Sequence, residues 1–203
     1  MRGEVADSAP DTSIPRNPNQ EIAPLSFTQQ RLWFLHQLQP DSAAYNIPLA
    51  FMLEGALDET ALVASLNALV ARHAALRTSF PLNGTEPQQH VAPTLTLPLT
   101  VHDLHALPPS DRDRAAHDLL HASATQPFDL ATAPLLRGLL LRLAPDRHLF
   151  ALTLHHSICD EWSLAIFLRE LGALYGAFPT HTPSPLPPLP IQYTDFTHWQ
   201  RAQ

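Results

Sequence analysis

Apolar residues recur at helical spacing in several stretches of the chain. After Asp58, a candidate N-cap, the residues Leu62, Leu66, Leu69 and Val70 follow i, i+4, i+7, i+8 spacing, which is typical of the buried face of an amphipathic helix. Apolar spacing and start signals predict further helices in the stretches SFTQQRLWFLHQL with Ser26 as N-cap, PPSDRDRAAHDLLHASATQ, DEWSLAIFLRELGALYGAF and IQYTDFTHWQRAQ.

Strand-forming stretches alternate with these helices. YNIPLAFMLEG is rich in β-formers and ends in glycine, and LLRGLLLRLAPDRHLFALTLHH predicts two strands around an Ala-Pro-Asp-Arg turn. Shorter strands are predicted in TSFPLNG, QQHVA and LTLPLTVHDL. This mixture indicates an α/β (α+β) two-layer sandwich, in which helices pack on a mixed sheet.

Proline divides the chain into parts. Residues 1–23 are polar, proline-spaced and without periodicity, which predicts a flexible leader or linker. Residues 24–203 are predicted to fold around one core, as a length of 203 residues and an apolar content of 45% suggest. Within them, residues 179–190 predict a stiff, extended proline-rich spacer and residues 191–203 a terminal helix.

Charge and composition exclude several classes of function. The net charge of -7 comes without a basic stripe, so neither nucleic acid nor an anionic membrane surface is an expected partner. A signal peptide and an apolar run of membrane-spanning length are missing from the sequence, and we expect a soluble, cytoplasmic protein. The single cysteine, Cys159, rules out an internal disulfide framework.

The stretch LTLHHSICDEWS holds the candidate chemistry. Side chains alternate along a strand, so Leu154 and His156 point one way while Thr153 and His155 point the other. The two histidines are therefore not expected to chelate together. Asp160 is predicted to open the next helix, where a carboxylate suits the positive helix end.

Four interpretations of these residues compete. A zinc site needs three or four ligands, and His155, His156 and Asp160 offer at best two that converge. A nucleophilic site at Cys159 is chemically possible, because a nearby imidazole lowers a thiol pKa. His156 could instead handle a proton while an amine or hydroxyl attacks an acyl carbonyl. In the fourth interpretation both histidines only satisfy hydrogen bonds at the end of a strand.

Four stretches, in order, resemble the motifs of one family. LHHSICDEWS is similar to the HHxxxDG core of the condensation domains of nonribosomal peptide synthetases, which share the chloramphenicol acetyltransferase fold. SFTQQRLWFL resembles the first motif of this family with Thr28 in the alanine place, and RHAALRTSF the second with Ala74 for glutamate. YTDFTHW resembles the fourth with Thr197 for alanine. The matches span residues 26–199.

The resemblance implies an acyltransferase that forms peptide bonds between substrates on the phosphopantetheine arms of donor and acceptor peptidyl carrier proteins. Family members consist of two lobes around a tunnel, so this chain would be the N-terminal lobe, with the C-terminal lobe and adjoining synthetase domains as further partners. The domain itself would bind no metal and no organic cofactor. The lobe alone is expected to be inactive, because one wall of the tunnel is missing.

The resemblance also assigns roles to residues. His156 would be the catalytic histidine, with His155 its structural neighbour, and Asp160 the aspartate that keeps the site in shape. Arg77 would pair with this aspartate, and loss of one member of a buried ion pair costs roughly 3 to 5 kcal/mol. Further supporting residues within or beside the third motif would be Cys159, Glu161 and Ser163.

The third motif departs from the family at Glu161, where glycine is expected. Glutamate removes the backbone freedom of glycine and adds a charge, so it could narrow the donor path or raise the pKa of His156. Alternatively, it points to solvent and changes little. The departure leaves open a noncatalytic module that docks carrier proteins or tailoring enzymes, and a free-standing acyltransferase trimer is a weaker alternative.

Overall fold

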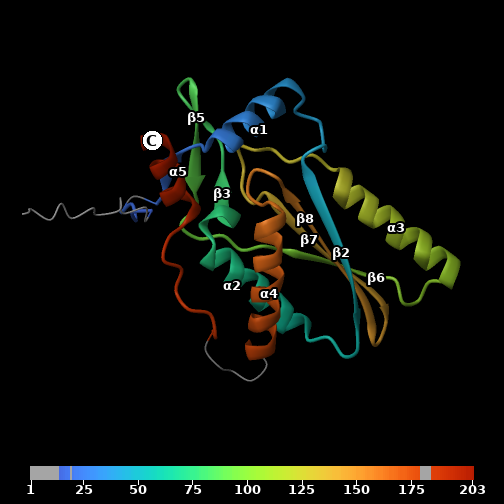
Figure 1. Cartoon of the computed structure of the whole chain (residues 1–203). Helices are drawn as coiled ribbons and strands as arrows, with labels where there is room; N and C mark the ends of the chain where they lie inside the picture. Colours follow the sequence, from blue (N-terminus) through green and yellow to red (C-terminus); the bar gives the residue numbers. More distant parts are fainter. Residues whose placement is uncertain (1–13, 19, 179–183) are drawn as a thin grey trace, which may run out of the picture.

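The structure is a computed structural model that describes residues 14–18, 20–178 and 184–203 (Figure 1). The helices are α1 (Phe27–Leu38), α2 (Glu59–Arg72), α3 (Pro109–Thr125), α4 (Glu161–Ala177) and α5 (Tyr193–Ala202), with a 3-10 turn at Ala74–Arg77. The strands are β1 (Ile22–Pro24), β2 (Asn46–Glu54), β3 (Thr78–Ser79), β4 (Leu82–Asn83), β5 (Glu86–Val91), β6 (Leu99–Asp103), β7 (Leu136–Ala144) and β8 (Arg147–His155). No helix in these ranges is long and apolar enough to cross a membrane.

The strands form two sheets. The larger sheet has the order β2-β8-β7-β6, in which β8 pairs antiparallel with both β2 and β7, while β6 and β7 are parallel. The smaller sheet has the order β1-β5-β3, with β4 also paired to β5, and all its pairs are antiparallel. The register of β2 on β8 places Asn46 opposite His155, at the end of the sheet where the histidine motif begins.

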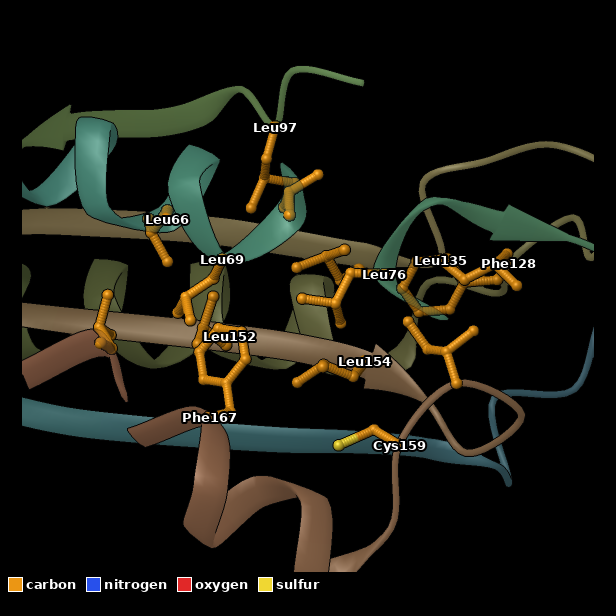
Figure 2. Packing of buried hydrophobic residues seen from close by; sticks show 14 of the residues in the cluster. Leu66, Leu69, Leu76, Leu97, Phe128, Leu135, Leu152, Leu154, Cys159 and Phe167 are labelled. Atoms are coloured by element: carbon orange, nitrogen blue, oxygen red, sulfur yellow. The ribbon is translucent and has the colours of Figure 1, made fainter. Parts of the chain in front are cut away.

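Helices cover both faces of the larger sheet. On one face, α2 and α4 lie side by side and pack on Leu152 and Leu154 of β8, as Figures 1 and 2 show. On the opposite face, α3 packs on Leu139 and Leu141 of β7. The predicted α/β class, with helices on a mixed sheet, is confirmed. The sequence predicted one sheet layer and one helical layer. In the structure helices cover both faces of the sheet.

The folded part begins earlier than predicted. Residues 1–13 and 19 lie outside the described residues, but the end of the predicted leader pairs with β5, Ile22 opposite His90. Just before it, the backbone N–H of Asn17 and the side-chain amide of Gln20 donate to Asp195 Oδ1, at 2.6 and 2.7 Å. Asp195 is fully buried, so it needs these donors, and they hold the segment on α5.

The C-terminal part ends in a helix, as predicted. Residues 184–190 of the predicted spacer form neither helix nor strand, and 179–183 lie outside the described residues. The terminal helix α5 presents Tyr193, Phe196 and Trp199 as a row of tilted rings along one side, with neighbouring ring centroids 5.4 and 6.0 Å apart. Its buried side is polar, however, and carries Asp195 and Thr197.

Candidate functional site

His155 ends β8 as a buried, neutral imidazole. It is 4% exposed, and its Nδ1 accepts the backbone N–H of Ser157 at 3.2 Å and lies 2.8 Å from the hydroxyl oxygen of Ser157. Burial lowers the pKa of His155 to about 4, with smaller contributions from His36 and His156. His155 therefore anchors the turn after the strand.

His156 lies beyond the strand, and its side chain is exposed. Its backbone N–H donates to the carbonyl oxygen of Tyr45 at 2.9 Å, which fixes the start of the turn. His156 lines a pocket of about 380 Å³. The two histidines thus have different environments, as the alternation along the strand predicted.

The loop after His156 leads into α4, and its last residue caps this helix. Asp160 is the N-cap of α4, and its Oδ1 accepts the backbone N–H of Ser163 at 2.8 Å and the hydroxyl of Ser163 at 2.6 Å. The hydroxyl of Ser163 is the main reason why the pKa of Asp160 is lowered. Glu161, the first residue of α4, is exposed. Asp160 thus opens the helix as predicted.

Cys159 belongs to the core. It is 6% exposed and lies in the same cluster as Leu154 and Phe167 (Figure 2). Burial, with a smaller contribution from the charge of Asp160, raises the pKa of its thiol to about 12. The thiol is therefore protonated at neutral pH, which argues against the nucleophilic alternative.

The zinc alternative lacks ligands. Within residues 14–18, 20–178 and 184–203, no three side chains among histidine, cysteine, aspartate and glutamate lie close enough together to hold a metal ion. His155 binds Ser157, while His156 faces the pocket. Their divergence is the reason the pair does not chelate.

Arg77 does not pair with Asp160 among the described residues, so this prediction is wrong. The Arg77 guanidinium donates to the carbonyl oxygen of Val70 at 3.1 Å and to that of Ala92. Val70 lies in the last turn of α2, whose carbonyls have no helical donor, and a positive charge is favourable there. Arg77 therefore closes the end of α2, while Asp160 is occupied by Ser163.

Buried glutamines connect the motifs. Gln29 lies within the first motif, whereas no pattern in the sequence pointed to Gln89. The side-chain amide of Gln29 on α1 donates to the carbonyl oxygen of Ser157 at 3.2 Å and to Gln89 at 3.3 Å. Gln89 donates in turn to Thr197 of α5 at 3.1 Å. The Tyr193 hydroxyl donates to Ser26 at 3.0 Å. The first, third and fourth motifs are thus joined by hydrogen bonds between parts of the chain far apart in sequence.

A buried ion pair attaches the second motif to α4, and it was also missed. Glu170 is 4% exposed, and its Oε2 accepts from Arg72 Nε at 3.0 Å and from His73 Nε2 at 2.7 Å. Burial alone would raise the pKa of Glu170, but the hydrogen bonds and charges of His73 and Arg72 outweigh it and lower the pKa. The helical spacing of Phe167, Glu170 and Leu174 could have indicated that Glu170 is buried, because it places Glu170 on the apolar face of α4.

All four motifs meet at the pocket that His156 lines. Its walls include Thr28 from the first motif, His73 from the second and Tyr193 from the fourth. Asp160 and Ser163 form the edge at the start of α4. An imidazole can both accept and donate a proton, so a histidine that lines a partly apolar pocket is suited to proton transfer.

Comparison with known proteins identifies the family. The family model described as "Condensation domain" matches residues 19–203. The chain is 49% identical to phosphinothricin tripeptide synthetase PhsC of Streptomyces viridochromogenes, over 97% of this chain and 18% of that protein. It is 43% identical to malpibaldin synthetase of Mortierella alpina, over 100% of this chain and 4% of that protein. The chain belongs to the condensation domain family of nonribosomal peptide synthetases, as predicted.

Solved structures support the fold. The starter condensation domain of rhizomide synthetase RzmA is similar with a TM-score of 0.81 at 24% identity, over 89% of this chain and 45% of that chain. A complex of the X-domain and OxyB from teicoplanin biosynthesis is similar with a TM-score of 0.78 at 29% identity, over 94% of this chain and 40% of that chain. The chain spans less than half of the solved chains and less than a fifth of the two synthetases.

The lowered pKa of His155 predicts a pH dependence of stability. In the folded chain His155 binds a proton only near pH 4, whereas a histidine in the unfolded chain binds one near pH 6.5. The contribution of His155 is therefore complete above pH 6.5 and is lost as the pH falls toward 4. We expect the free energy of unfolding of the native chain to fall over this range by about 3 kcal/mol more than that of His155→Gln.

Urea unfolding at several pH values measures this difference. His121→Gln is the control, because it replaces an exposed histidine that does not contribute to the lowered pKa of His155, and it should keep the native pH dependence. Equal pH dependence in the native chain and His155→Gln would contradict the prediction.

The buried ion pair predicts a large loss of stability on truncation. Glu170→Ala leaves Arg72 and His73 without their shared carboxylate, and we expect the free energy of unfolding to fall by about 3–5 kcal/mol. Arg114→Ala is the control, because its pair with Asp111 is exposed, with side chains 71% and 43% accessible. The control should lose less than about 1 kcal/mol in urea unfolding. Similar losses in both variants would contradict the assignment.

Proposed function

We propose that this chain is the N-terminal lobe of a condensation domain that joins a donor acyl or peptidyl thioester to an acceptor amine. The observation that carries the proposal is the meeting of all four family motifs at the pocket lined by His156. Family membership supports acyl transfer with peptide-bond formation in general. The reactants would arrive on the phosphopantetheine arms of carrier proteins, and the lobe itself would use neither metal nor organic cofactor.

His156 would handle the proton of the acceptor amine. The amine nitrogen attacks the thioester carbonyl carbon, the C–N bond forms, and the C–S bond breaks as the carrier thiolate leaves. The imidazole takes the ammonium proton as the tetrahedral intermediate forms and can return it to the thiolate. This role requires that His156 stay at a fixed position, which the neighbouring anchors at His155 and Asp160 support.

Asp160 and His155 would act through position. Asp160 caps α4 and holds Ser163, so its carboxylate shapes the loop that follows His156. Buried His155 holds the other side of this loop through Ser157. Cys159 contributes packing from the core.

A second candidate function is docking without catalysis. Glu161 replaces the glycine of the family motif with an exposed charge at the first residue of α4. The similarity to the complex of the X-domain and OxyB also favours this candidate, because that chain belongs to a complex with a second protein. A docking module would use the same fold while forming no amide bond.

Product formation distinguishes the two candidates. In a complete condensation domain that contains this chain, supplied with loaded donor and acceptor carriers, we expect amide product by mass spectrometry. His156→Ala should reduce the rate about 100- to 10,000-fold, because it removes the proton acceptor. His121→Ala, an exposed histidine on α3, is the matched control and should keep the native rate.

Glu161→Gly separates a tolerated substitution from an inactivating one. A native rate that changes little in this variant means that Glu161 faces solvent without consequence. Product that appears only after glycine is restored would contradict catalysis by the native sequence and favour the docking module.

The isolated 203-residue chain should form no product with the same carriers. The chain spans 45% of the solved RzmA domain, so part of the tunnel wall would come from the second lobe. Beside Glu161, Trp162 is 80% exposed, an unusual position for a large apolar side chain that supports a covering partner here. Turnover by the isolated chain in the same mass-spectrometric assay would contradict a two-lobed site.

A further inference from the structure

Residues 184–192, which we call the strap, contribute part of the wall of the pocket that His156 lines. Leu189 and Ile191 of the strap are half-buried and line the pocket, together with Gln192. The strap has no helix or strand of its own. Its position therefore depends on what it contacts.

Three hydrogen bonds attach the strap to the end of α2. Arg72 donates to the carbonyl oxygen of Pro187 at 2.6 Å. The Gln192 side chain accepts from the backbone N–H of Ala74 at 2.9 Å and donates to the carbonyl oxygen of Arg72 at 3.0 Å. These contacts lie on both sides of Leu189 and Ile191, so they hold this wall in place.

The strap is also connected to the buried carboxylate of α4. Arg72 binds Glu170 through Nε at 3.0 Å and through a second nitrogen at 3.3 Å, while a third nitrogen reaches Pro187. A guanidinium bound in this way keeps a fixed orientation. Glu170 thus positions the strap through Arg72.

The pocket suits an uncharged, apolar group. Leu32, Leu76, Ile158 and Phe167 are buried residues in its wall. Two polar side chains of the lining have partners of their own, since Asp160 binds Ser163 and His73 binds Glu170. A volume of about 380 Å³ lies within the usual range for small-molecule sites, about 300–1,000 Å³.

We propose that this pocket takes the apolar side chain of an aminoacyl substrate, and that Leu189 and Ile191 determine the size of the side chain accepted. This inference rests on the proposed function, in which His156 acts on an aminoacyl thioester. Leu189 and Ile191 belong to a segment that is neither helix nor strand, unlike the helical walls of the pocket. Substitution there changes the volume of the pocket while the helical walls stay in place.

Affinity for substrate analogues tests the pocket without turnover. The probes are aminoacyl-pantetheine amides with alanine, leucine, tryptophan or glutamate side chains, in which the amide replaces the reactive thioester. Calorimetric titration of the complete domain should give tighter binding for leucine than for alanine or glutamate. Leu189→Ala and Ile191→Ala should raise the affinity ratio of tryptophan to leucine roughly tenfold, since pocket size changes of this kind discriminate by such factors.

Two further variants control for folding. Leu189→Phe keeps an apolar contact while filling the pocket, and it should lower the same ratio. Leu186→Ala is the matched control from the same strap, because Leu186 packs against the core cluster without lining the pocket. Its affinity ratio should equal that of the native domain.

The outcomes for the pocket and for the proposed function differ. An unchanged affinity ratio in Leu189→Ala, Ile191→Ala and Leu189→Phe would overturn the inference, as would failure of the native domain to bind any probe. A native domain that shows the expected ratios yet forms no amide product would support the pocket and overturn the proposed reaction.

Discussion

The carboxylate of Glu170 is the constraint on which the candidate site depends. A buried charge is costly unless donors surround it, and here Arg72 and His73 supply them from the end of α2. The ion pair therefore fixes α2 against α4 at the level of the pocket. Because Arg72 also holds Pro187, one carboxylate connects two helices and the strap.

Helix α4 links this ion pair to the loop that contains His156. α4 begins at Glu161 with Asp160 as its N-cap, directly after the loop that contains His156, and carries Glu170 further along. On the other side, His155 anchors the loop to the end of β8 through Ser157. His156 is thus placed between two fixed points, and its side chain lines the pocket because the residue lies just beyond the end of β8.

Patterns within one element were predictable, whereas contacts between distant elements were not. The spacing of Leu62, Leu66 and Leu69 predicted a buried helical face, and all three are buried. In contrast, the family resemblance suggested Asp160 as the partner of Arg77. In the structure Arg77 binds backbone carbonyls instead, because its guanidinium lies at the end of α2. Asn17 and Gln20 looked like part of a linker because their partner, Asp195, lies near the far end of the chain.

The central claim is that the reaction takes place in the pocket lined by His156. A crystal structure of the complete domain with a leucyl-pantetheine amide tests it most directly. The account predicts the aminoacyl nitrogen within hydrogen-bond reach of the His156 imidazole, about 2.6–3.2 Å, with the leucine side chain against Leu189 and Ile191. Binding of the analogue in the hollow of about 490 Å³ between β6 and α3, away from His156, would contradict it.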